Sequence, residues 1–504
     1  LVWLLDEYRK AGLGALEITP SVTAQPHIHS ASYILHKNHG YPTAAQKTQT
    51  KPNHQYITPN QQYMTMRKSL VFIMLLVAVA ANAKKELWPD GTVIDPWFSN
   101  ATKIDPTQLG RHYVVTDYGV LTDSTIVQTE RIQAVIDRAA NDGGGVVVIP
   151  QGTFLSGSLF FKPKTHLHIA EGGRLKGSER IIDYAITTTR IEGETCKYFS
   201  ALVNADKVDN FSITGKGTID GNGLAYWQEF WIRRQWNPQC TNKDAQRPRL
   251  VYISNSTDVT VQDVRLVNSP FWTNHLYRCQ RVRYLDCYIY APTEGIYEPQ
   301  PKRGAPSSDA IDIDVCDDVL IQGCFMHVND DAVVLKGGKG TYADKDENNG
   351  PCNRIIIQDC RYGRVHGCLT LGSESLHDRN IIIRRCHAEN ANRVIWLKMR
   401  PDTPQHYEYV TVEDMTGKCG SFIVVRPWTQ FFKPQQRDDM PLSECNNITM
   451  RNIKMECRNF FDVGKSDKYY LHDFTFEDID VTDEKKEFSE TMIENTRTRN
   501  VRIR

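Results

Sequence analysis

The motif Val259-Thr260-Val261-Gln262-Asp263-Val264 decides the fold, because it returns six more times along the chain. The further copies occupy residues 282–287, 319–324, 355–360, 381–386, 410–415 and 448–453. Their first residues lie 23, 37, 36, 26, 29 and 38 positions apart, a range of spacing that is typical of solenoids. Alternation of apolar and polar residues within each copy predicts a strand whose apolar side turns inward.

One short strand per repeat, few helical signals and variable spacing favour an all-β fold, a right-handed single-stranded parallel β-helix. Adjacent coils of such a solenoid stack at about 4.8 Å. Longer spacings indicate coils that carry loops. Residues Gly337 to Asn353 are the clearest such loop and are expected to form a cleft wall. The helical stretch Thr129 to Ala140 is expected to be a short N-terminal capping helix that closes the first coil.

Cysteine occupies the sixth place of four copies of the motif, at Cys287, Cys324, Cys360 and Cys386. Stacking would bring these side chains into one internal column, where free thiols behave as small apolar groups. Disulfide pairing stays open as the alternative, because the chain carries 13 cysteines and shows signs of export.

Two acidic blocks, a histidine and a lysine lie among the repeats: Asp309, the pair Asp330 and Asp331, His366 and Lys398. Hydrolysis of a glycosidic bond needs two carboxyl groups, one protonated to release the leaving oxygen and one ionised to activate water. Asp309 and Asp330 are 21 residues apart, which is about one coil, so we expect them on one face of neighbouring coils. Splayed side chains would give the separation of about 6.5–9.5 Å that inverting enzymes use. Crowding of the carboxylates predicts a raised pKa for one of them.

These blocks, in this order, resemble the polygalacturonases of glycoside hydrolase family 28. The family's pattern of Asn-Thr-Asp, Asp-Asp, Gly-His-Gly and Arg-Ile-Lys is approximated by residues 307–309, 329–331, 365–367 and 396–398, with further matches at 116–119, 143–150, 215–221 and 269–272. The resemblance runs from about Tyr113 to the C-terminus and implies the pectin-lyase-like form of the β-helix. It also implies hydrolysis of galacturonosyl linkages in pectic polysaccharide with inversion, without a metal or a cofactor.

The resemblance implies a role for each matching residue. Asp330 resembles the general acid, and Asp309 and Asp331 resemble the carboxylates that activate water. His366 resembles the histidine that tunes the acid, and Lys398 the cation that holds a substrate carboxylate. The alternative is that the three aspartates are turn residues at coil corners.

The chain departs from the family pattern at Trp396 and at Val365, and Ser307-Ser308 replaces Asn-Thr. Trp396 stands where the family has arginine, and an indole cannot replace the bidentate grip of a guanidinium on a uronate carboxylate. Val365 replaces the first glycine of Gly-His-Gly. Trp396 is expected to bind substrate by stacking on a sugar face, with Arg400 as a substrate-binding cation and Arg393 and Arg426 as further candidates. These departures favour a variant substrate, such as a rhamnogalacturonan backbone or a galacturonide chain end.

Roles for three further residues stay open. His275 lies on an earlier coil and is predicted to bind substrate, with a structural role as its alternative. Asp312 and Asp314 alternate with isoleucines along a predicted strand, so solvent-facing, supporting and catalytic roles are all possible for them.

Two other functions stay open as well. A pectate lyase would share the β-helix but would eliminate rather than hydrolyse, and it would require calcium and a basic residue. A non-catalytic carbohydrate-binding β-helix would keep every measurable property after the substitution Asp330→Asn.

The N-terminal part of the chain does not continue the repeat. Residues 1–65 are interpreted as upstream read-through or a misannotated start, because residues 66–83 run from basic through apolar to small side chains, as in a secretory signal peptide. Residues 84–112 are expected to form an N-terminal extension and residues 113–504 the catalytic β-helix. The protein is therefore expected to be secreted or periplasmic.

The charge is balanced, at 60 basic and 60 acidic residues, which gives no indication of a nucleic-acid partner. No membrane partner is expected, because no other long apolar run exists. The expected partner is a pectic polysaccharide or oligogalacturonide, bound by a monomer.

Overall fold

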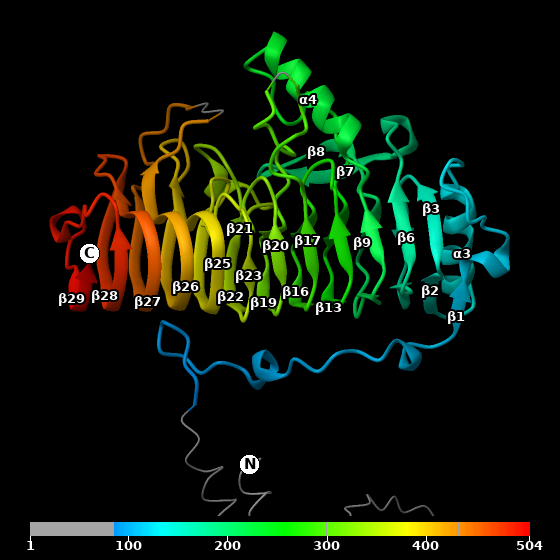
Figure 1. Cartoon of the computed structure of the whole chain (residues 1–504), viewed down its shortest axis with the longest axis horizontal. Helices are drawn as coiled ribbons and strands as arrows, with labels where there is room; N and C mark the ends of the chain where they lie inside the picture. Colours follow the sequence, from blue (N-terminus) through cyan, green and yellow to red (C-terminus); the bar gives the residue numbers. More distant parts are fainter. Residues whose placement is uncertain (1–84, 299, 431–433) are drawn as a thin grey trace, which may run out of the picture. The chain divides into compact units, whose positions relative to one another are not determined.

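The computed structural model describes residues 85–298, 300–430 and 434–504, so the interpretations of residues 1–65 and 66–83 lie outside it. The chain winds into a parallel β-helix (Figure 1). This confirms the predicted fold class. The prediction of one short strand per coil is wrong, because each of the earlier coils contributes strands to three separate stacks.

The three stacks run side by side along the solenoid. The first contains β1 (His112–Val114), β2 (Gly145–Ile149), β5 (Thr165–Ile169), β10 (Ser212–Thr214), β13 (Thr257–Gln262), β16 (Gln280–Leu285), β19 (Asp317–Gln322) and β22 (Pro351–Gln358). The second contains β3 (Gly152–Ser156), β6 (Gly173–Gly177), β11 (Thr218–Asp220), β14 (Arg265–Val267), β17 (Tyr288–Tyr290), β20 (Phe325–His327) and β23 (Arg361–Tyr362). The third contains β4 (Leu159–Phe161), β9 (Val203–Asp206), β12 (Val251–Ser254), β15 (Asn274–Tyr277), β18 (Ile311–Asp314), β21 (Val333–Lys336) and β24 (Leu369–Leu371).

Later coils consist of long continuous strands that pass through more than one stack. These are β25 (His377–Met399), β26 (His406–Pro427), β27 (Ser443–Val463) and β28 (Tyr469–Asp483), and β29 (Arg497–Ile503) pairs with β28. Short 3-10 turns are η1 (Pro96–Ser99), η2 (Pro106–Gln108), η3 (Val115–Tyr118), η4 (Ile181–Asp183), η5 (Ala343–Lys345) and η6 (Glu490–Met492).

The repeated motif stacks in register in the first stack, where Val259 pairs with Val282 and Val282 with Val319. Its fifth residue turns the chain from the first stack into the second. Asp263 and Asp286 adopt left-handed φ angles of 62° and 52° there. Aspartate and asparagine tolerate this conformation better than most side chains, which explains why the motif carries them at this place.

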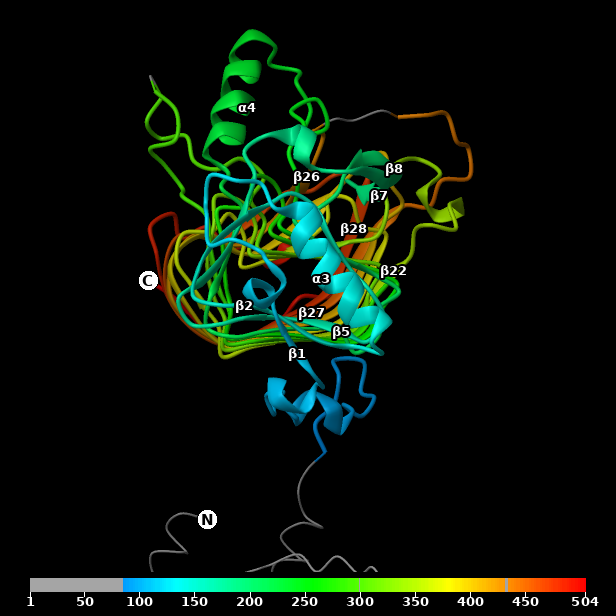
Figure 2. The same cartoon turned by 90° about the vertical axis from the view of Figure 1, so that its right-hand side faces the viewer.

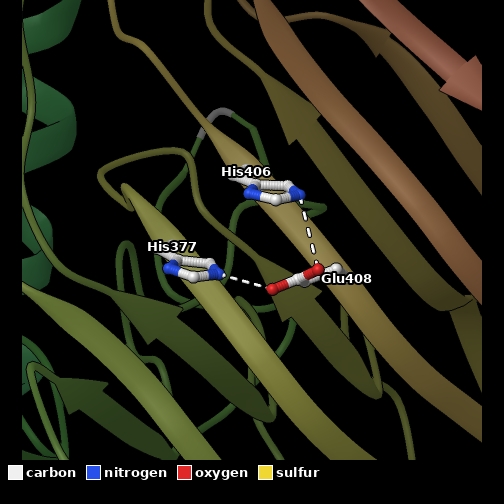
Figure 3. Close-up of side chains that lie close together, drawn as sticks. All are labelled: His377, His406 and Glu408. Carbon is white, nitrogen blue, oxygen red and sulfur yellow. Dashed lines mark hydrogen bonds and ion pairs between the residues drawn. The ribbon is translucent and has the colours of Figure 1, made fainter. Parts of the chain in front are cut away.

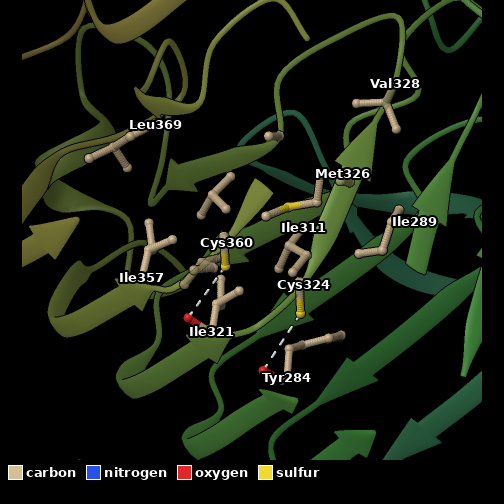
Figure 4. Packing of buried hydrophobic residues seen from close by; sticks show 14 of the residues in the cluster. Tyr284, Ile289, Ile311, Ile321, Cys324, Met326, Val328, Ile357, Cys360 and Leu369 are labelled. Atoms are coloured by element: carbon tan, nitrogen blue, oxygen red, sulfur yellow. Dashed lines mark hydrogen bonds between the residues drawn. The ribbon is translucent and has the colours of Figure 1, made fainter. Parts of the chain in front are cut away.

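The four cysteines of the motif form a buried internal column, which Figure 4 shows in part. All 13 cysteines of the chain are free. The thiol of Cys324 donates to the carbonyl of Tyr284 and that of Cys360 to the carbonyl of Ile321. The stacked free thiols are therefore confirmed over the disulfide alternative.

The N-terminal end of the solenoid is capped by α3 (Thr129–Asn141), as predicted (Figure 2). Its apolar face buries Ile132, Val135, Ile136 and Ala139 in the core of the coils. Ahead of it, the segment from residue 85 to residue 112 runs along the outside of the first stack (Figure 1). Trp88 and Phe98 of this segment pack on side chains of that outer face, namely Leu285, Leu320, Ile356 and Ile382.

Three insertions stand on one side of the coils. They are the antiparallel hairpin of β7 (Ile186–Ile191) and β8 (Glu194–Phe199), the helix α4 (Leu224–Trp236) and the loop 337–350 (Figure 1). The loop was predicted to reach Asn353, but β22 already begins at Pro351. Across the described ranges, neither α-helix has the length and apolar character needed to cross a membrane.

Candidate active site

The three aspartates singled out in the sequence meet beside two neighbouring strands of the third stack. Asp309 lies two residues before β18 and Asp331 two residues before β21. Because Ile311 pairs with Val333, Asp309 and Asp331 occupy matching positions in adjacent coils. Each of Asp309, Asp330 and Asp331 offers a carboxylate oxygen within 4.8 Å of the other two.

Asp309 and Asp331 lie one strand spacing apart, at matching positions in adjacent coils, and Asp330 precedes Asp331. Asp309 Oδ1 and Asp331 Oδ1 are both buried and have no hydrogen-bond partner among the described residues. Buried acceptors of this kind are normally satisfied, so the two oxygens suit a donor that arrives with the substrate.

The carboxylates line a pocket of about 270 Å³. The other lining residues are Glu192, Phe230, Trp231, Arg234, Asn242, Trp272, Pro306, Ser307, Asn329, Lys336, His366, Gly372, Ser373, Glu374, Trp396, Lys398, Trp428 and Gln430. The loop 337–350 contributes none of them and lines a neighbouring pocket instead. The prediction that this loop forms the cleft wall is therefore wrong for the pocket of the three aspartates.

His366 lies one coil beyond Asp330 and faces it. Its backbone N–H donates to the carbonyl of Asp330 at 2.8 Å, and its Nδ1 lies 3.4 Å from Asp330 Oδ1. Burial opposes charge on both groups, but their hydrogen bond and mutual attraction outweigh it. The pKa of His366 is raised and the pKa of Asp330 is lowered. In the free protein the shared proton is therefore favoured on the imidazole.

The pKa of Asp309 is shifted in the direction opposite to that of Asp330. Its side chain is buried, and burial together with the negative charge of Asp330 raises its pKa well above the ordinary range. Crowding was predicted to raise the pKa of one carboxyl, and that carboxyl is Asp309. Asp309 and His366 thus favour holding a proton, whereas Asp330 favours the ionised form.

Lys398 is held between a carboxylate and two indole rings. Its Nζ donates to Asp331 Oδ2 at 2.7 Å, with the two side chains 9% and 1% exposed. The same ammonium lies 4.2 Å from the ring centre of Trp396 and 4.9 Å from that of Trp428. Arg393 lies over the Trp396 ring as well, at 3.7 Å. The cation predicted to hold a substrate carboxylate is therefore in the pocket, beside the proposed base.

A second lysine, Lys336, lies in the same pocket. Its Nζ is 3.4 Å from Asp312 Oδ1 and 3.3 Å from Glu374 Oε2. Burial raises the pKa of Asp312 to about 7 despite this lysine. Asp314 is also fully buried, with Arg190 Nε at 3.1 Å. A solvent-facing role for Asp312 and Asp314 is therefore wrong. Asp312 contacts the lining residue Lys336, and Asp314 pairs with Arg190.

The comparison with known proteins agrees with this site. The profile of glycosyl hydrolases family 28 matches residues 163–499, which include all four site blocks. The chain belongs to this family. A polygalacturonase of Chamaecyparis obtusa is 22% identical over 302 residues, which cover 59% of this chain and 54% of that protein. The matched region spans about half the length of the first curated relatives.

Solved structures of family 28 enzymes share the fold. An exopolygalacturonase from Thermotoga maritima has a TM-score of 0.59 at 21% identity, covering 74% of this chain and 87% of that one. A polygalacturonase from Erwinia carotovora has a TM-score of 0.61 at 18% identity, covering 80% of this chain and 99% of that one. At these identities the likeness shows the β-helix and not the substrate.

Two of the residues predicted to bind substrate do not reach the pocket of this family 28 protein. His275 is fully buried, with Arg249 Nη1 donating to its Nδ1 at 2.6 Å and Asp314 Oδ2 3.5 Å from its Nε2. Burial lowers the pKa of His275 to about 3, so the ring is neutral. Arg400 is 2% exposed and forms two hydrogen bonds of 2.7 Å with Asp402. We therefore correct both expectations, because each side chain already has buried protein partners.

The helix α4 supplies lining residues that the sequence analysis missed. Phe230, Trp231 and Arg234 all come from it. Aromatic residues at positions 226, 227, 230 and 231 have the spacing of one helical face, which is the signal that was overlooked.

Two groups of residues in the described part of the chain have side chains arranged to hold a cation. One is the three aspartates, where Lys398 and His366 already supply positive charge. The other comprises His377, His406 and Glu408, outside the pocket.

Proposed function

We propose that this protein hydrolyses galacturonosyl linkages in pectic polysaccharide, with inversion at the anomeric carbon. The observation that carries the proposal is the meeting of Asp309, Asp330 and Asp331 with His366 in one pocket. Membership of glycosyl hydrolases family 28 and likeness to polygalacturonases support it. Because the match spans only about half of the first curated relatives, the activity is an inference from the site and the family together.

In this mechanism Asp330 protonates the leaving oxygen as the bond to the anomeric carbon breaks. A water molecule attacks that carbon from the opposite face and passes its proton to a carboxylate. The unpartnered oxygens of Asp309 and Asp331 suit the binding of this water. Asp330 is ionised in the free protein, so it must receive its proton from His366 or Asp309 when substrate displaces solvent beside it.

The close approach of the carboxylates makes the stereochemistry a strict test. The three carboxylates each bring one oxygen within 4.8 Å of the others, so two of them can hold the water while the third serves as acid. Proton NMR of the first product formed distinguishes the outcomes, and a product with the configuration of the original linkage would overturn this mechanism.

The pocket favours a chain end or a variant backbone as substrate. Its volume of about 270 Å³ lies below the range of about 300–1,000 Å³ of ordinary ligand pockets, so it suits a short piece of polymer. Glu192, from the turn of the hairpin, and Trp231 and Arg234 from α4 line it. Lys398 is the lysine aligned with the family's uronate-binding position, and the arginine of that pattern is missing.

The experiment compares the full chain with its Asp330→Asn variant on homogalacturonan and on rhamnogalacturonan, in the presence of chelator. Reducing ends formed by the wild type alone, without new ultraviolet absorbance, are the expected result and identify the backbone. Absorbance that is lost with chelator would instead indicate a lyase. Release of monomers or dimers from the first minutes, rather than a ladder of oligomers, is expected for attack at chain ends.

Export and oligomeric state belong to the same proposal. We infer that residues 66–83 direct secretion or periplasmic export and that the enzyme acts as a monomer. N-terminal sequencing of the exported protein and light scattering test these two points.

A further inference from the structure

A second cluster of chemically active side chains lies outside the pocket, on the outer face of the long strands. His377 is the first residue of β25 and His406 the first residue of β26, and the two pair in register. Glu408 lies two residues beyond His406 and therefore on the same face of its strand. Figure 3 shows both imidazole rings pointing their nitrogens at the Glu408 carboxylate.

The three side chains converge from two adjacent coils. His377 Nε2 lies 2.9 Å from Glu408 Oε1, and His406 Nε2 lies 3.6 Å from Glu408 Oε2. The imidazole rings are parallel to within 3°, with centres 4.9 Å apart. Each histidine side chain is 38% exposed, whereas Glu408 is 11% exposed. The cluster is therefore anchored by its carboxylate and open to solvent at its imidazoles.

The nitrogen of His406 that faces the cluster carries a lone pair. The side-chain amide of Asn446 donates to His406 Nε2 at 3.0 Å, so that nitrogen is an acceptor. An imidazole nitrogen that carries a lone pair is the atom that binds a metal ion.

Both positively and negatively charged side chains surround the cluster. Arg379 Nη1 lies 3.5 Å from Glu408 Oε1, and its Nη2 lies 3.0 Å from Asp90 Oδ2. Glu444 borders the same face and bonds His472 at 2.6 Å. Arg379 pairs in register with Glu408 and contacts the same carboxylate oxygen as His377, so it helps to orient that carboxylate. The competing explanation is a plain ladder of histidine–carboxylate hydrogen bonds.

We propose that His377, His406 and Glu408 form a binding site for a divalent late-transition metal ion of the zinc type, which ties two coils of the β-helix together. Two imidazoles and a carboxylate are a ligand set suited to zinc. Bound zinc holds such ligands at about 2.0–2.2 Å, so neighbouring ligand atoms lie about 3.3 Å apart. The observed separations of 2.9 and 3.6 Å from nitrogen to oxygen lie on either side of that value.

Two features indicate that this site is structural. The three residues do not line the pocket of the aspartates. They join the beginnings of β25 and β26, where the backbone N–H of His406 also donates to the carbonyl of Leu376. A metal ion here would therefore stabilise the coils and leave hydrolysis unchanged.

The test uses the full chain, stripped with chelator and dialysed, and titrates it with Zn²⁺ by calorimetry. Other histidines of the chain can also bind zinc, so the measured quantity is the difference between wild type and variants. We expect His406→Ala and Glu408→Gln each to lose one equivalent of bound zinc, together with the rise in melting temperature that zinc gives the wild type. The control is His387→Ala, which changes an exposed histidine of the same strand β25 that contacts Thr416. This variant should keep both the equivalent of bound zinc and the rise in melting temperature.

Cobalt substitution supplies a second readout. We expect Co²⁺ to give visible absorption in the wild type and in His387→Ala that is absent from Glu408→Gln. Circular dichroism without metal shows whether each variant folds. If His406→Ala does not fold, Glu408→Gln alone is used as the test variant. Equal stoichiometry in wild type and Glu408→Gln, or a wild type whose melting temperature zinc does not change, would overturn the proposal. Hydrolysis in chelator is measured separately, so failure of the metal site and failure of the proposed activity are distinguishable.

Discussion

The substitution Lys398→Met isolates the buried ion pair of the pocket. It removes the ammonium 2.7 Å from Asp331 Oδ2 while keeping most of the side-chain volume between Trp396 and Trp428. Asp331 is 1% exposed and its Oδ1 has no partner among the described residues, so its charge would be left buried and uncompensated. Breaking a buried pair in this way costs about 3–5 kcal/mol. We therefore expect the free energy of unfolding to fall by about that amount at pH 7.

Urea unfolding followed by tryptophan fluorescence measures this loss, and a double variant gives the matched control. Asp331→Asn combined with Lys398→Met removes both charges, so most of the stability should return. Activity should not return, because Asp331 is one of the proposed water-binding carboxylates. If Lys398→Met unfolds at the urea concentration of the wild type, Lys398 does not neutralise Asp331 and the reasoning fails. If the double variant regains activity, Asp331 has no part in the chemistry.

Three further predictions concern Asp330, His366 and the buried ion pair of Arg190 and Asp314. Asp330→Asn should lower kcat by about 10²–10⁴-fold, and an unchanged rate of reducing-end release would exclude Asp330 as the acid. The pKa of His366 is raised in the folded state, so its contribution to stability is present below about pH 6.5, the ordinary histidine value, and is lost as the pH rises through the raised pKa. Urea midpoints between pH 5 and 9 should show this loss in the wild type and not in His366→Gln. Arg190→Met leaves Asp314 buried without its guanidinium and should cost about 3–5 kcal/mol in the same assay, whereas a cost below 1 kcal/mol would contradict a buried pair.

The coil architecture could be predicted because each coil repeats the same local physics. Apolar residues at alternate positions, as in Val259 and Val261, give the buried side of a strand, and Asp263 at the following place gives the left-handed turn. The three strands per coil were missed because β14 and β15 are only three and four residues long. Strands that short carry too few alternations to be separated from loops.

The positions of the site residues could be predicted where they depend on the register of the coils. They were missed where they depend on an inserted segment or on buried partners. Asp309 and Asp331 come together because adjacent coils pair in register. His275 is buried, and its two ring nitrogens face Arg249 and Asp314 of adjacent coils. Arg400 is removed from the pocket by Asp402, only two residues away. A charged neighbour at that spacing is common at surfaces as well, so the sequence alone did not indicate a buried pair.

Trp396 now has a more specific interpretation than a platform for sugar stacking. Its side chain is 9% exposed, and the charged groups of Arg393 and Lys398 lie 3.7 and 4.2 Å from its ring centre. A ring so covered offers little surface to a sugar. It does hold the ammonium of Lys398 in place, through cation–π attraction of about 0.5–2 kcal/mol. We therefore propose that Trp396 is a positioning residue for Lys398.

The substitution Trp396→Leu distinguishes the two interpretations. Loss of about 0.5–1 kcal/mol at Lys398 should raise KM for polygalacturonate by about two- to five-fold with little change in kcat. The same variant should lose nothing on a carboxyl-reduced polymer, because that substrate presents no charge to Lys398. A sugar platform would be needed equally by both polymers. An equal rise in KM on the charged and the reduced substrate would therefore show that the indole contacts the sugar itself, and that Lys398 does not depend on Trp396 for its position.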